Sequence, residues 1–256
     1  MPESILSWGN AFLFSATILA FFVKAITGFG NTLVMGSLFT FVIPNAITTP
    51  VDLLIGLPAN GYIAWRERKA ITLKVALPLA LLMVVGLVPG TFFLKTGPDW
   101  LLRASLGLVI LGMALQMALK KPEPQTGKLN KAALAFTGLV SGVLSGMFGI
   151  GVLVAIYFSK TTDNKQQFRS NTCFVFLFEN IFRVVLYWAT GILNREVFLI
   201  TLALLPAVVI GMALGRKADK HVDEAKMKHA VIALLILSGT TLFIRNILPL
   251  TSIFSG

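Results

Sequence analysis

Long uncharged runs recur along the whole chain and leave few folds open to it. Most of them approach the length of about 20 residues with which a helix crosses the hydrocarbon core of a bilayer. Charged residues make up only 13% of the chain, where soluble domains carry about 25%. The sequence therefore predicts an all-α polytopic membrane protein. The runs cover residues 4–23, 25–51, 53–65, 75–94, 104–119, 132–159, 184–194, 197–215 and 230–244.

The net charge of +11 would also be compatible with nucleic-acid binding. Lys and Arg, however, gather in the short loops between apolar runs, where positive charge orients a membrane protein. The expected surroundings are thus a lipid bilayer and no nucleic acid. A single cysteine, Cys173, excludes a disulfide within the chain.

The spans fall into two sets of five with similar order and spacing. We expect a first repeat over residues 1–120, a cytoplasmic linker over 121–129 and a second repeat over 130–256. Because five is odd and every basic loop falls on one side, the repeats should be inverted, with both termini periplasmic. The expected helices are 6–26, 29–43, 49–65, 73–94 and 100–119, then 131–147, 149–160, 170–190, 196–215 and 226–246.

Near its start each repeat has an uncharged run that contains a Gly-x-Gly pair, at Thr27–Asn31 and at Phe148–Val152. Glycine costs about 1 kcal/mol relative to alanine inside a helix, so these pairs predict a stop and restart. The first two segments of each half should form a Gly-broken hairpin. Broken helices in matching positions of two repeats are the best sequence pointer to a transport site. We expect both tips to meet near the midplane of the membrane.

A restarting helix presents backbone N–H groups and the positive end of its dipole, which favour an anion. The glycines would let a ligand approach the backbone, and neighbouring Thr, Asn and Ser side chains would add donors. Helix packing is the alternative role, and we assign it to the stripe of Gly138, Gly142 and Gly146. The candidate substrate-binding residues of the two tips are Thr27, Gly28, Gly30, Asn31, Ser145, Gly149 and Gly151.

Ionisable residues inside the spans add to this hypothesis. Lys24, one turn before the first break, would cost about 3 kcal/mol if it faced lipid, so it is a candidate anion ligand. Glu179 and Arg183 face one another at i, i+4, either as a structural ion pair or with Arg183 in the site. Asp52 and Glu179 are candidates for coupling or ion pairing. Asn171, near the expected start of its helix, is a further candidate donor.

No Walker loop, His-Glu-x-x-His or nucleophile elbow is visible in the sequence. His221 and His229 lack the Cys or carboxylate spacing of a metal site. The sequence therefore predicts no enzyme, no cofactor and no metal.

Two motifs, Lys24-Ala-Ile-Thr-Gly-Phe-Gly-Asn31 and Ser141-Gly-Val-Leu-Ser-Gly-Met-Phe-Gly-Ile-Gly151, resemble those of the TauE/SafE family. The resemblance covers essentially the whole chain. It implies a secondary transporter of small sulfur-containing anions, such as sulfite, sulfoacetate or other organosulfonates, in the bacterial inner membrane. Asn31-Thr32 and Val152-Leu153 replace further glycines of the family pattern.

Three other readings remain open at this stage: a passive anion channel, a transporter of a different small organic anion, and a membrane-embedded scaffold. The coupling ion is a proton, sodium or none. The sequence does not decide between uptake and export.

Overall fold

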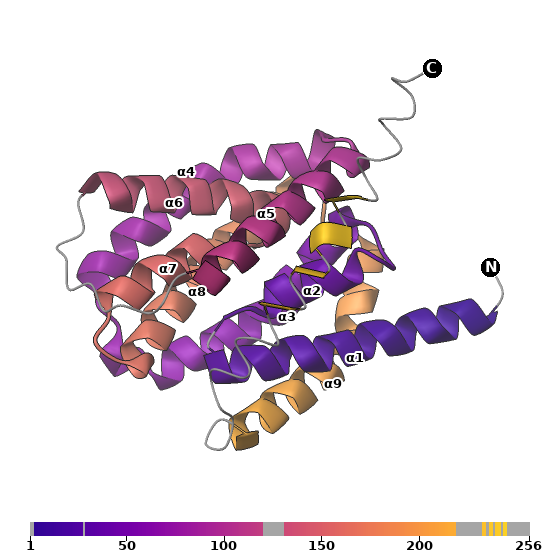
Figure 1. Ribbon diagram of the computed structural model, residues 1–256, viewed down its shortest axis with the longest axis horizontal. Coiled ribbons are helices and arrows are strands. Elements are labelled where there is room, and N and C mark those ends of the chain that lie inside the picture. The colour runs from indigo at the N-terminus through magenta and orange to yellow at the C-terminus, as the bar shows by residue number, and fades with distance from the viewer. Residues whose placement is uncertain are drawn as a thin grey trace.

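The computed structural model describes residues 3–27, 29–119 and 131–218, together with 232–233, 236–237, 239–241 and 243–244. Over these residues the fold is helical without strands, which confirms the all-α prediction (Figure 1). Gly28, the expected linker 121–129 and most of the expected helix 226–246 lie outside the described residues. The elements are α1 (Glu3–Thr27), α2 (Asn31–Phe39), α3 (Asn45–Arg66), η1 (Arg68–Ala70), α4 (Leu73–Thr96), α5 (Asp99–Leu119), α6 (Lys131–Phe148), α7 (Val152–Thr161), α8 (Lys165–Ala189) and α9 (Arg195–Ala218).

Four of the described helices are long and apolar enough to cross a membrane: α1, α4, α8 and α9. Helix α3 has 22 residues but falls outside this group. It carries a set of buried polar side chains, and such residues are retained inside a bundle when they have a function. They are Asn45, Thr48, Thr49, Asp52 and Asn60.

Both expected breaks are present. Helix α1 ends at Thr27 and α2 begins at Asn31, while α6 ends at Phe148 and α7 begins at Val152. Helices α2 and α7 have only 9 and 10 residues. At about 1.5 Å per residue they cover roughly half of a hydrocarbon core about 30 Å thick. Neither short helix is therefore long enough to cross the core alone.

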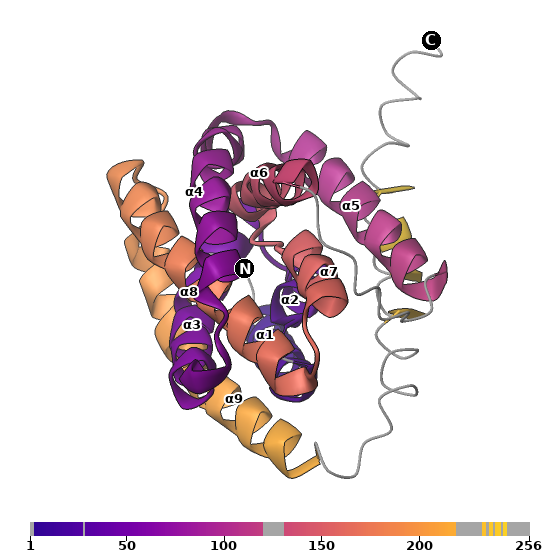
Figure 2. The same cartoon turned by 90° about the vertical axis from the view of Figure 1, so that its left-hand side faces the viewer.

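The long helices of the N-terminal part pack against those of the C-terminal part (Figures 1 and 2). Helix α4 lies beside α6, α1 lies beside α9, and α3 contacts α8. Figure 2 shows α4 and α6 side by side, with the two short helices α2 and α7 inside the bundle. The two expected repeats are therefore interleaved instead of forming separate bodies.

Glycines allow the backbones of these helix pairs to approach closely. A Cβ atom added to Gly142 of α6 would collide with the carbonyl oxygen of Met83 on α4. A Cβ on Gly211 of α9 would lie 2.5 Å from the carbonyl oxygen of Ile18 on α1. The packing role expected for the Gly138, Gly142 and Gly146 stripe is confirmed.

Three expected boundaries are wrong by four residues or more. Helix α2 ends at Phe39 and not at residue 43, and α3 begins at Asn45 and not at residue 49. Helix α8 begins at Lys165 and not at residue 170. The Asn164 side chain caps it by accepting a hydrogen bond of 2.8 Å from the Gln167 backbone N–H. This cap lies in the basic 160–169 stretch, whose charges predicted a loop. The earlier start of α8 places Asn171 in the second turn of the helix.

Candidate functional site

A small cavity lies where the two breaks meet. It has a volume of about 40 Å³ and is lined by residues of α1, α2, α3, α8 and the α6–α7 junction. From the first break it receives Gly30, and from the second it receives Gly149 and Gly151. The structure thus brings both Gly-x-Gly segments to one cavity.

The backbone at the two breaks is arranged for this approach. Gly30 and Gly149 have φ angles of +93° and +73°, a left-handed region that residues with a Cβ rarely adopt. Gly30 precedes α2 and Gly151 precedes α7, and neither helix start receives a side-chain cap. The first N–H groups of a helix have no partner within it. Two uncapped helix starts therefore border the cavity.

The first polar network of the cavity runs from α1 through α2 to α3. The ammonium of Lys24 donates to Oδ1 of Asn31 at 2.9 Å. The Asn31 amide in turn donates to Oδ1 of Asp52 at 2.7 Å. The Thr32 hydroxyl donates to the other carboxylate oxygen, Oδ2, at 2.5 Å. Lys24 and Asp52 are 1% and 3% exposed, so both charges are buried and linked through Asn31.

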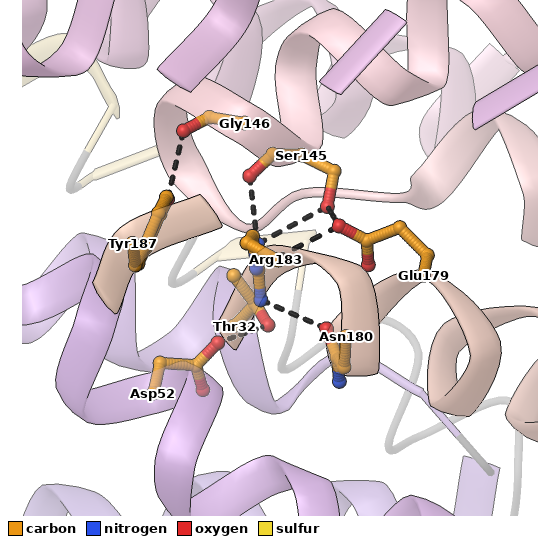
Figure 3. Close-up of polar contacts among 8 residues, drawn as sticks. All are labelled: Thr32, Asp52, Ser145, Gly146, Glu179, Asn180, Arg183 and Tyr187. Atoms are coloured by element: carbon orange, nitrogen blue, oxygen red, sulfur yellow. Dashed lines mark hydrogen bonds and ion pairs between the residues drawn. The ribbon is translucent and has the colours of Figure 1, made fainter. Parts of the chain in front are cut away.

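The second network is centred on Arg183 of α8 (Figure 3). Its Nη1 donates to the carbonyl oxygen and to the hydroxyl of Ser145, at 2.7 and 3.1 Å. Its Nη2 donates to Oδ1 of Asn180 at 3.0 Å. The Nε atom lies 3.6 Å from Oε1 of Glu179, which also accepts from the Ser145 hydroxyl. The expected pairing of Glu179 with Arg183 is present.

Gly149 lies where the two networks meet. A Cβ atom on Gly149 would lie 3.2 Å from Nη1 of Arg183 and 3.4 Å from Oδ2 of Asp52. It would also lie 3.2 Å from the methyl carbon of Thr32. Figure 3 shows Thr32 just below the Arg183 side chain and Asp52 below and to the left of it. A cation from one expected repeat and a carboxylate from the other therefore face the same glycine.

Most of the candidate residues line this cavity, and three take other places. The Thr27 hydroxyl bonds to the carbonyl oxygens of Val23 and Phe29. Ser145 reaches the site only through Glu179 and Arg183. Asn171 accepts from the Thr72 N–H and donates to the Gln167 carbonyl, away from the cavity. The candidates that line it are Lys24, Gly30, Asn31, Asp52, Gly149, Gly151, Glu179 and Arg183.

The structure adds lining residues that sequence reasoning missed. Asn60 lies eight positions after Asp52 in α3, and residues at this spacing share a helix face. Its Oδ1 atom is buried without a hydrogen-bond partner among the described residues. Thr32 and Asn180 follow candidates directly in sequence, which could have drawn attention to them. The added residues are Phe29, Thr32, Leu33, Gly56, Asn60, Ile150, Phe176 and Asn180.

The family profile described as Sulfite exporter TauE/SafE matches residues 13–242. The chain belongs to this family. It is accordingly a membrane transporter and not an enzyme.

Two relatives share this assignment to transport. One is the probable sulfite/organosulfonate exporter TauE of Cupriavidus necator, 26% identical over 87% of this chain and 89% of that protein. The other is the probable membrane transporter protein ORF9 of a Sinorhizobium species, 29% identical over 55% of this chain and 56% of that protein. No solved structure matches the chain.

Proposed function

We propose that this TauE/SafE protein carries small sulfur-containing anions across the bacterial inner membrane by alternating access. The observation that carries the proposal is the cavity shared by both breaks. Two buried cations, Lys24 and Arg183, line it together with the two uncapped helix starts. Helix N-termini and fixed cations are complementary to an anion. The name of the TauE relative, a probable sulfite/organosulfonate exporter, indicates the substrate class.

The size of the cavity supports a compact ligand. A cavity volume of about 10–15 Å³ is enough for one water molecule. The 40 Å³ found here is therefore room for about three waters or for an oxyanion head group of similar size. A sulfite ion or the sulfonate end of a small organic molecule suits this volume better than a bulky ring. The substrate-binding residues that we propose are Lys24, Gly30, Asn31, Gly149, Gly151 and Arg183.

We further propose that the chain consists of two inverted repeats, 1–120 and 130–256, joined by the cytoplasmic linker 121–129. Exchanging the repeats replaces α1 by α6 and α4 by α9. The contact of α4 with α6 then becomes the contact of α9 with α1, and both contacts exist. The contact of α3 with α8 maps onto itself. This reciprocity supports the proposed repeat. The loop charges predict that both termini are periplasmic.

The proposed repeats suggest how access alternates. Substrate sites of such transporters lie near the bilayer midplane at the repeat interface, and one bundle of helices rocks against another around the site. Here Asp52 and Arg183 come from different repeats and meet at Gly149. Rocking would separate or close these contacts, so that the cavity opens first to one side and then to the other.

Counterflow in sealed liposomes tests this function. Purified protein is reconstituted with unlabelled sulfite inside, and labelled sulfite is added outside. We expect accumulation of label, competed by sulfoacetate and methanesulfonate and much less by acetate. Anion conductance without counterflow would show a channel instead. Counterflow of carboxylates with no response to any sulfur oxyanion would show a different substrate.

A further inference from the structure

The cavity contains a balanced set of buried charges. Lys24 and Arg183 are the cations, and Asp52 and Glu179 are the carboxylates; the other lining residues are uncharged. None of the four is more than 3% exposed. In its formal charge state the cavity is therefore neutral before a substrate arrives. An anion that enters alone makes it negative.

A buried charge without a compensating partner costs free energy, and a buried ionisable group without a partner usually takes its neutral protonation state. Taking up one proton on a carboxylate restores the balance for each negative charge brought in. Such a proton must come from water and must leave the protein together with the anion, because a neutral carboxyl left behind in the empty cavity would make it positive.

The two carboxylates differ in what protonation would cost them. Glu179 lies 3.6 Å from the guanidinium of Arg183, so neutralising it would break a buried ion pair. Asp52 accepts hydrogen bonds from two neutral groups, the Asn31 amide and the Thr32 hydroxyl. Its link to the Lys24 ammonium runs through Asn31. Neutralising Asp52 therefore breaks no direct ion pair among the described residues.

We propose that Asp52 is a proton-binding site that makes this protein a proton–anion cotransporter, with one proton moving in the same direction as each singly charged anion. This inference rests on the anion transport proposed above. A proton from water binds a carboxylate oxygen of Asp52 as the anion binds, and it returns to water on the other side. No covalent bond to the anion forms, and nothing is oxidised or reduced.

The surroundings of Asp52 fit this role. The charged or titratable groups that face it are Lys24 on α1 and Glu179, Arg183 and Tyr187 on α8. The donors from α2, Asn31 and Thr32, do not titrate, and the α6–α7 junction contributes Gly149. Protonation of Asp52 removes its pull on Lys24 through Asn31. The ammonium then becomes the partner of the anion.

The test measures protons and anions in the same liposomes. Methanesulfonate is the substrate, because it is fully ionised near neutral pH and cannot itself carry the proton. Labelled methanesulfonate reports the anion, and a pH-sensitive dye inside the vesicles reports the proton. We expect about one proton per anion, and a rate that changes little when a membrane potential is imposed, since the pair is neutral.

Three variants locate the proton. In Asp52→Asn the number of protons per anion should fall at least about fivefold, because the amide cannot take up a proton. Glu196→Gln, an exposed position at the start of α9, is the matched control and should keep the ratio of the unmodified protein. Glu179→Gln separates the two carboxylates. A ratio lost in Glu179→Gln but kept in Asp52→Asn would overturn the assignment to Asp52.

Measurements of counterflow and proton movement on the unmodified protein test the coupling even if a variant fails to fold. Counterflow of methanesulfonate without proton movement would overturn coupling and leave the transport function intact. Absence of counterflow for every sulfur oxyanion would instead refute the proposed function. Sodium-dependent uptake without acidification would make sodium the coupling ion and refute the proton site.

Discussion

Lys24 and Asp52 lie on different helices and share one side chain between them. Asn31 accepts from the Lys24 ammonium at 2.9 Å and donates to the Asp52 carboxylate at 2.7 Å. Asn31 is also the first residue of α2, directly after the break. The position of the restarting helix is thus tied to two opposite charges, and a change at either charge is felt at the helix start.

The bridge through Asn31 predicts that the effects of Lys24 and Asp52 on the free energy of unfolding are not additive. Lys24→Met and Asp52→Asn should each destabilise the protein, by about 1–3 kcal/mol, because each leaves a buried polar partner unsatisfied. The double variant should cost less than the sum, with an interaction of about 0.5–3 kcal/mol. Thermal or denaturant unfolding in detergent measures all three.

The control for this cycle pairs Lys24→Met with Glu196→Gln, which is exposed and remote from the network. These two effects should add. If the effects of Lys24→Met and Asp52→Asn on stability also add, Asn31 does not transmit an interaction between the two charges.

A second prediction concerns the space beside Gly151. An added Cβ there would collide with the ring of Phe176, which also lines the cavity. Gly151→Ala should push the ring into the cavity and lower anion affinity at least about tenfold, or about 1.4 kcal/mol. Binding of sulfite by isothermal calorimetry measures the loss.

Two further variants decide whether the ring is the cause. Phe176→Leu combined with Gly151→Ala should recover most of the affinity, because the shorter side chain makes room. Gly112→Ala, where an added Cβ meets nothing within 4 Å, should leave binding unchanged. If Phe176→Leu brings no recovery, the alanine acts through the α7 backbone and not through the ring.

The sequence predicted the helices and the breaks because their signals are local. Uncharged runs locate the spans, and paired glycines locate the restarts. Lys24, Asp52 and Arg183 stood out because charges are rare inside such runs. The i, i+4 spacing also predicted the contact of Glu179 with Arg183.

Other features depended on tertiary contacts that the sequence does not show. The sequence suggested Asn171 as a donor in the site, near a helix start. Helix α8 begins earlier, however, and the Asn171 side chain forms hydrogen bonds with Thr72 and Gln167. Asn60 reads as one polar residue in a span, and only packing places it in the cavity. The bridge through Asn31 required the exact approach of α1, α2 and α3.

Membrane topology gives a third prediction. Lys69, in the basic connection after α3, should be cytoplasmic, and Arg195, at the start of α9, should be periplasmic. Each is replaced by cysteine in a Cys173→Ser background and labelled with a reagent that does not cross the membrane. Labelling of both cysteines from the same side would contradict the inverted repeats.

The central proposal is that one bound anion contacts both helix breaks, and protection of cysteines in the cavity tests it most directly. Thr32→Cys and Phe176→Cys place a thiol on the cavity wall from each proposed repeat, again in a Cys173→Ser background. Thr96→Cys, exposed at the end of α4, is the control. Methanesulfonate, which does not react with thiol reagents, should slow thiol modification at both cavity positions with the same half-saturating concentration, and should not affect the control. Protection of only one cavity position, or of neither, would contradict a single site shared by the two breaks.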